Sequence, residues 1–144
     1  MDLGHWLDGL FFHVAREADI LLLLTSLTIP DLRNMKRLWP ILREWFPEGD
    51  KVRLLVNRHY KGATLGLKDL EQVVHRPVFQ TLSSDYAAVI AAINQGKPLA
   101  ETGPRSRFYQ DLQNLAQRLV LENGGQKAAP APAGPRLFRF FSRK

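Results

Sequence analysis

Apolar and polar positions in the first third of the chain follow two patterns, one typical of helices and one typical of buried strands. Apolar residues recur at helical spacing over residues 6–18, which predicts an amphipathic helix. Residues 19–25 are apolar almost without interruption, which is typical of a strand buried on both faces of a sheet. A second helix is expected to start at Thr28, where a capping hydroxyl precedes Pro30. Pro40 lies inside that second helical pattern and predicts a kink or a break.

The rest of the chain repeats the order of strand and helix. Since strands that alternate with helices are joined by right-handed crossovers, this order predicts an α/β fold, a parallel sheet with flanking helices. The expected elements are a strand over 51–56, a polar loop over 57–62, a helix over 67–74, a strand over 77–82, a helix capped by Ser83, Ser84 and Asp85 that ends at Gly96, and a last helix over 108–119.

Three strands buried on both faces make an unusual complete sheet, because an apolar strand at a sheet edge invites pairing with other chains. The pattern is consistent with a sheet whose missing side comes from another segment of a longer polypeptide or from a partner chain. A compact three-stranded domain whose edge is covered by helices explains the same pattern. Both explanations remain open at the level of periodicity alone.

The net charge of +6 is concentrated near the C-terminus. Five of the 20 basic residues lie after residue 126, where no acidic residue occurs, so the preceding part carries 15 basic against 14 acidic residues. A nearly neutral body disfavours a broadly basic nucleic-acid-binding domain. Nucleic acid is therefore the less favoured partner, and the basic tail is the part that would contact an anionic surface.

Composition also bounds the chemistry and the location. The absence of cysteine excludes disulfides and thiolate metal sites, and the four histidines are scattered without a second ligand at metal-binding spacing, so no direct metal site is predicted. No apolar run is long enough for a membrane span, and no secretion signal opens the chain. These features favour a cytoplasmic protein.

The chain divides into three expected segments: a folded unit over 1–122, a flexible linker of Gly, Pro and Ala over 123–135, and a basic amphipathic tail over 136–144. In a helical tail the apolar side chains would gather opposite the arginines, which predicts a peripheral, reversible contact with anionic membrane at the inner face of the cell membrane. A tail that docks on a protein, or that binds nothing, is the alternative. The tail residues are Arg136, Leu137, Phe138, Arg139, Phe140, Phe141, Arg143 and Lys144.

Several short motifs occur in a fixed order along most of the chain. They include Asp2-Leu-Gly, the apolar strand 19–25, Pro30-Asp-Leu-Arg-Asn34, Lys51-Val-Arg-Leu-Leu-Val-Asn-Arg58, Arg76-Pro-Val-Phe79, Asp85-Tyr-Ala-Ala-Val89 and Ala92-Ile-Asn-Gln-Gly-Lys-Pro-Leu99. In this order and spacing, residues 2 to about 120 resemble the C-terminal half of the TadZ/CpaE-type pilus assembly ATPases. These form a branch of the MinD/ParA family, which has a deviant Walker A P-loop.

The resemblance implies a partial P-loop NTPase fold that lacks the N-terminal half carrying the P-loop, with ATP and Mg²⁺ as the cofactors of the intact family. It implies that Asp2 is the Walker B-like acid on the Mg²⁺ side, and that Asn57 hydrogen-bonds the adenine edge. Arg58 would flank the base, and Ser84 with Asp85 would lie in the loop that closes over it. Ser83 departs from the family pattern, which has proline there. Without the resemblance, Asn57 is equally a loop residue that bonds the local backbone.

The family's phosphate loop is Gly-rich and contains Lys and Ser or Thr, and the printed sequence contains no such segment. Gly62 and Gly66 lack the required spacing. Because backbone N–H groups and the lysine of that loop stabilise the transferring phosphoryl group, this chain alone is expected neither to hydrolyse ATP nor to bind ATP and Mg²⁺ tightly.

The resemblance thus implies a partial ParA/MinD-like ATP-binding protein that positions or assembles a pilus or secretion apparatus. It would work as a homodimer or together with the missing N-terminal half, and would recruit pilus or secretion components. The alternative is a non-enzymatic interaction module anchored to the membrane by its basic tail. A ParA-type nucleic-acid-binding protein is the third interpretation, which the near-neutral body disfavours.

Overall fold

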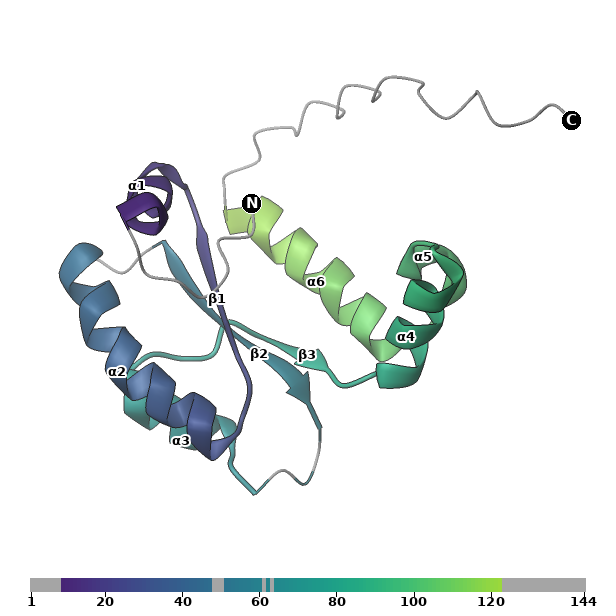
Figure 1. The fold of residues 1–144 in the computed structure, drawn as a ribbon, viewed down its shortest axis with the longest axis horizontal. Coiled ribbons are helices and arrows are strands. Elements are labelled where there is room, and N and C mark those ends of the chain that lie inside the picture. The colour runs from purple at the N-terminus through teal and green to yellow at the C-terminus, as the bar shows by residue number, and fades with distance from the viewer. Residues whose placement is uncertain (1–8, 48–50, 61, 63, 123–144) are drawn as a thin grey trace, which may run out of the picture.

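The computed structural model describes residues 9–47, 51–60, 62 and 64–122. Within these ranges the chain alternates helices and strands, in the order that the sequence predicts (Figure 1). The elements are α1 (Gly9–Glu17), β1 (Leu21–Thr25), α2 (Ile29–Trp45), β2 (Val52–His59), α3 (Leu67–Val74), β3 (Gln80–Ser83), α4 (Tyr86–Gln95), α5 (Leu99–Thr102) and α6 (Arg107–Glu122).

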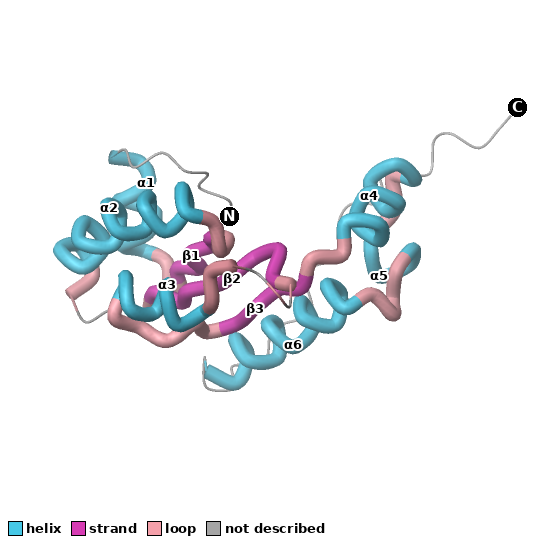
Figure 2. Tube along the Cα trace, turned by 90° about the horizontal axis from the view of Figure 1, so that it is seen from below, coloured by secondary structure: helices cyan, strands magenta, loops and turns pink. Residues whose placement is uncertain are grey.

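The three strands form one parallel sheet in the order β1-β2-β3, which confirms the predicted α/β fold. The register of β1 on β2 runs without interruption from the pair Leu21–Val52 to the pair Thr25–Val56. Helices α1, α2 and α3 cover one face and α6 covers the other, whereas α4 and α5 stand apart beyond the end of β3 (Figure 2).

Two apolar clusters hold the layers together. Because side chains alternate along β2, Leu54 faces the helices α1 to α3 while Leu55 faces α6. The smaller cluster consists of Leu55, Leu82 and Leu115. The larger cluster contains Phe11, Ala15, Met35, Trp39, Leu42, Phe46, Val52, Leu54, Val56, Leu70 and Val74.

Strand β2 is buried on both faces as predicted, but β1 is not. Leu21 and Leu23 pack against the larger cluster. Leu22 and Leu24 point to the opposite face, where they are 42% and 52% exposed. The prediction of two buried faces is therefore wrong for β1. On the face where α6 covers β2 and β3, no helix among the described residues covers β1.

Helix α2 shows why local sequence signals work well at its start and less well in its middle. The hydroxyl of Thr28 accepts a hydrogen bond from the backbone N–H of Asp31 and donates to the Asp31 carboxylate, so the predicted cap is present. Pro40 does not split the helix, which continues to Trp45. Pro40 has no N–H and so leaves one helical hydrogen bond unmade. Trp39 and Leu42, on either side of it, are buried, and their packing against the sheet keeps this part of the chain helical.

Other boundaries differ from the predictions. Strand β2 continues to His59, into the stretch predicted as a polar loop, and β3 begins at Gln80 rather than at residue 77. The short helix α5 was not expected. The first helix is described only from Gly9 onward.

Lys51 joins the ends of two helices at the start of β2. Its ammonium group donates to the backbone carbonyls of Arg16 (2.8 Å) and Ala18 (3.3 Å), at the C-terminal end of α1. The same group lies 4.9 Å from the ring centroid of Phe46, directly after α2. A cation in this place stabilises the negative end of the helix dipole and satisfies carbonyls that the helix leaves unpaired.

No helix among the residues that the structure describes is long and apolar enough to cross a membrane.

Candidate functional site

The carboxyl ends of β2 and β3 lie side by side and bring two polar segments together. The pairing of the strands is regular up to Val56–Thr81, shifts after Val56, and resumes at His59–Ser83. Directly beyond it, the N–H of Ser84 donates to the carbonyl of His59 over 2.9 Å. This arrangement places four predicted site residues at the carboxyl ends of the strands. We call these residues, Asn57, Arg58, Ser84 and Asp85, the strand-end group.

The shift in register has its cause at Arg58. This residue has a φ of 52°, in the left-handed region that side chains other than glycine adopt rarely. The side-chain oxygen of Asn57 accepts a hydrogen bond from the N–H of Arg58 over 2.9 Å, which holds this conformation. A strained residue that persists beside the end of a strand is a feature of functional sites, since the surrounding structure must stabilise it.

The side chains of the strand-end group are only partly engaged with the protein. Asp85 is the N-cap of α4, as predicted, and its carboxylate accepts from the N–H of Ala88 over 3.3 Å. Arg58 and Ser84 are exposed, whereas Asn57 and Asp85 are half-buried. The amide nitrogen of Asn57 is still able to donate, because the bond to Arg58 uses the oxygen of that side chain.

Two exposed aromatic residues border the group, and sequence reasoning missed both. Tyr60 follows the end of β2 and is 61% exposed, and Tyr86 begins α4 and is 76% exposed. Exposed aromatic rings can stack on the face of a planar ring system. The sequence did carry a signal, since each tyrosine comes directly after a polar segment that ends a strand.

Asp111 was missed as well, and no local pattern could have found it. Its carboxylate accepts from the N–H of Ser83 over 2.7 Å, which ties α6 to the end of β3 across 28 residues of sequence. Arg118 supports the other end of β3: its guanidinium lies 4.0 Å from the ring centroid of Phe79 and donates to the carbonyl of that residue.

Two groups of predicted residues lie outside the described part of the chain. Asp2 precedes the first described residue, and the basic tail 136–144 follows the last one. Their predicted roles are therefore not tested by the geometry.

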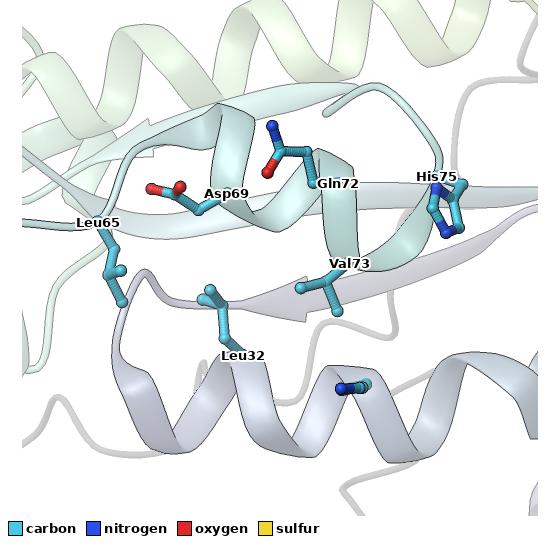
Figure 3. Close-up of a pocket in the computed structure, with 7 residues that line it drawn as sticks. Leu32, Leu65, Asp69, Gln72, Val73 and His75 are labelled. Atoms are coloured by element: carbon cyan, nitrogen blue, oxygen red, sulfur yellow. The ribbon is translucent and has the colours of Figure 1, made fainter.

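The strand-end group does not line the cavity that the structure shows between α2 and α3. This cavity has a volume of about 500 Å³, and Leu32 of α2 and Val73 of α3 point into the space between the helices (Figure 3). The other lining residues are Lys36, Leu65, Asp69, Gln72 and His75. No cluster of three or more His, Cys, Asp or Glu among the described residues could hold a metal ion.

Comparison with solved structures identifies the fold. The ParA family ATPase of Chlorobium tepidum superposes with a TM-score of 0.69 at 19% identity, over 76% of this chain and 46% of that one. A chain of the MinC:MinD cell division protein complex of Aquifex aeolicus gives a TM-score of 0.65 at 17% identity, over 87% of this chain and 50% of that one. MinD of Pyrococcus horikoshii, solved with Mg-ADP, gives 0.59 at 17% identity, over 76% and 44%.

No protein-family model matches the chain, and no curated protein matches it. The chain spans about half the length of the solved proteins with which it superposes. At this level of identity the likeness concerns the fold alone: the α/β fold of this chain resembles part of the solved ParA and MinD ATPases.

Proposed function

We propose that this chain supplies the adenine-contacting side of a ParA/MinD-like ATP-binding protein that positions or assembles a pilus or secretion apparatus. One observation carries the proposal: the strand-end group, predicted from scattered motifs, comes together at the carboxyl ends of two neighbouring parallel strands. Ligands of open α/β sheets bind at this edge. The fold shared with MinD, one example of which was solved with Mg-ADP, supports the same ligand class.

The donors and surfaces at this edge fit a purine base. Asn57 can offer its amide to the ring edge, and the exposed Arg58 can cover a ring face with its planar guanidinium. Ser84 and Asp85 would close the other side. The described residues do not fit the triphosphate, because they include no Gly-rich loop with a lysine. When bound, ATP with Mg²⁺ would supply the nucleotide-dependent signal, and Asp2 would lie on the Mg²⁺ side.

On this proposal the protein acts by binding and assembly, without hydrolysing ATP by itself. It would function as a homodimer, or completed by a polypeptide with the phosphate loop, and would recruit pilus or secretion components at the cytoplasmic face of the membrane. A role in assembly is supported by one of the solved proteins with a similar fold, the MinD of Aquifex aeolicus, which was solved in complex with MinC.

The sharpest test compares adenosine with ATP. Because the chain offers contacts to the base and no cradle for the phosphates, we expect adenosine, ADP and ATP to bind with affinities within about threefold of each other. Guanosine should bind more weakly, since its ring edge exchanges a donor for an acceptor. NMR titration of the full chain would report binding at the amides of the strand-end group. Shifts that scatter over the molecule, or equal shifts with guanosine, would contradict the proposal.

The variant Arg58→Gly separates binding from folding. Glycine adopts the left-handed backbone of this position without strain, so the fold should persist, whereas the loss of the guanidinium should weaken adenosine binding about tenfold. His75→Gly is the matched control, because His75 has the same left-handed backbone (φ 51°) and lies at the end of α3. Equal adenosine affinity in the two variants would remove Arg58 from the site.

A specific observation favours a second function. The amide oxygen of Asn57 and a carboxylate oxygen of Asp85 already accept hydrogen bonds from backbone N–H groups. Both residues therefore have a structural role without any nucleotide, as expected for a non-enzymatic interaction module. Such a module would use the basic tail as its membrane anchor. Failure of adenosine, ADP and ATP alike to shift any resonance would decide for this function.

The proposed membrane contact is tested separately by sedimentation with anionic liposomes. We expect the full chain to pellet and a chain ending at Ala128 to remain in solution, because the truncation removes the arginines and phenylalanines of the tail. High salt should release the full chain. Equal pelleting of the two forms would refute the contact.

A further inference from the structure

Helix α4 is apolar nearly all round, yet little of it is buried. Seven of its ten residues are Ala, Val or Ile, and no charged residue occurs between Asp85 and Lys97. Within the helix only Ala92 is buried, whereas Tyr86 and Ile93 are 76% and 66% exposed. A helix without a charged face is normally covered by other elements. The exposure of α4 therefore indicates a surface that another molecule covers.

One side of α4 packs against its own chain. A Cβ atom added at Gly103, directly after α5, would lie 3.4 Å from the Cβ of Ala88, so the two segments approach closely. Ala92 lies one turn after Ala88 and shares this inner side. The opposite side of the helix, which we call the outer face of α4, is exposed except at the half-buried Ile90. At 100° per residue it carries Tyr86, Ala87, Ile90, Ile93 and Asn94.

The outer face of α4 is remote from the edge where a further strand would extend the sheet. The strand order is β1-β2-β3, and α4 follows β3. Figure 2 shows α4 and α5 beyond the end of β3, on the side away from β1. A polypeptide that pairs with β1 would add its strand at the opposite edge, so completion of the sheet does not account for the exposed face of α4.

The outer face is complementary to itself when two copies of α4 pair antiparallel about Ile90. In this arrangement Ile90 meets Ile90 of the second copy, and Ile93 meets Ala87, so a large side chain lies opposite a small one. The ends of the helices match in charge. Lys97, which is exposed just after α4, comes near Asp85 at the start of the other helix. Since the helix itself has no charge, no like charges oppose each other along the pair.

We propose that two copies of this chain associate through the outer face of α4 as an antiparallel helix pair. One short helix from each copy supplies the contact, so the association is weak and depends on concentration. It requires no nucleotide, and it goes beyond the proposed function, which names no surface for a homodimer. Each copy places Lys97 beside Asp85 of the other, and the dimer thereby adds a cation next to the strand-end group.

Engineered cysteines give a direct test, because the chain contains no cysteine of its own. Ile90→Cys puts two thiols together at the centre of the proposed pair. On oxidation with diamide, this variant of the full chain should form a disulfide-linked dimer at least about tenfold faster than the control, because pairing raises the effective thiol concentration. The control is Leu121→Cys, on α6, where the leucine is 79% exposed.

A mixture of two variants tests the register. Ala87→Cys and Ile93→Cys face each other only in the antiparallel pair, so mixing them should yield a heterodimer. Each variant alone should react at the rate of the Leu121→Cys control. Two copies of residue 87 stand about 9 Å apart along the pair, at 1.5 Å per residue, beyond the reach of a disulfide.

The association without a covalent link is measured by sedimentation equilibrium of the full chain over a range of concentrations. Ile93→Lys should raise the dissociation constant of the dimer at least about 100-fold, since the two-fold symmetry places two such lysines in one apolar contact. Leu121→Lys should leave it unchanged. Because Ile93 is exposed, its substitution should not disturb the fold, which circular dichroism verifies.

Three results would overturn the proposal. They are oxidation of Ile90→Cys no faster than that of Leu121→Cys, a dimer that persists undiminished in Ile93→Lys, and a chain that stays monomeric up to about 1 mM. A monomeric chain whose pelleting with anionic liposomes is lost in Ile93→Lys would assign the outer face to lipid, and would overturn the proposal equally. Because no readout involves nucleotide, a failure here leaves the adenosine test unaffected.

Discussion

At the scale of single residues, the backbone at Arg58 and His75 is the most informative feature. Both residues have φ close to 50°, and they are the positions other than glycine with positive φ among those that the structure describes. His75 has a plain structural reason for this conformation, since it ends α3 as a left-handed cap, a place where glycine is common. Arg58 lies within a strand, where this conformation has no such purpose.

The substitution His75→Gly should therefore stabilise the fold. Glycine removes left-handed strain of about 1 kcal/mol, partly offset by the greater freedom of glycine in the unfolded chain, so we expect a gain of up to about 1 kcal/mol. Urea denaturation followed by circular dichroism measures the change. His75→Ala supplies the comparison, because it removes the ring and keeps the strain. Equal stability of the two variants would show that the backbone is relaxed at this position.

At the scale of elements, α2 has an internal proline that it tolerates through tertiary packing. Pro40 is exposed and cannot donate a hydrogen bond to the carbonyl of Lys36 one turn earlier. Pro40→Ala should raise the free energy of unfolding by about 1–3 kcal/mol, measured as a higher denaturation midpoint. Pro30→Ala is the control in the first turn of the same helix, where proline is favourable and its replacement should bring no gain. A fall in stability for Pro40→Ala would mean that packing around the ring matters more than the missing bond.

Elements with strong local signals were predictable, and those set by distant contacts were not. Thr28 and Asp85 cap their helices as the sequence indicates, because capping involves residues within three positions. The extension of β2 through Asn57 to His59 was missed, since polar residues there read as a loop while their pairing depends on β3. Continuous leucine in β1 could not distinguish two buried faces from one, because burial depends on a helix that the local sequence does not specify.

The candidate site was predictable to a similar degree. Parallel topology dictates that the ends of β2 and β3 lie together, so the placement of Asn57 and Ser84 at the same end of the sheet followed from the order of elements. The support that Asp111 gives to Ser83 did not follow, because it arises from a contact across 28 residues.

At the scale of the whole molecule, the proposed function predicts that a nucleotide is bound without being hydrolysed. The sequence contains no Gly-rich segment with Lys and Ser or Thr, so the main electrostatic stabilisation of phosphoryl transfer is lacking. We expect no ATP turnover by the purified full chain above the rate without protein, measured by phosphate release with Mg²⁺. Turnover that co-purifies with the chain and is lost in Arg58→Gly would refute this expectation.

The contacts of Lys51 have a consequence for regulation. One ammonium group closes the end of α1, and α1 contributes Phe11 and Ala15 to the larger cluster. Acylation of that amine would abolish its charge and two of its three donors, so the tether between α1 and the sheet would be lost without any change at the strand-end group. A chain treated in this way, or carrying Lys51→Gln, should exchange the amide hydrogens of α1 well before those of α6. A modification of one half-buried side chain would then be enough to loosen α1 from the sheet.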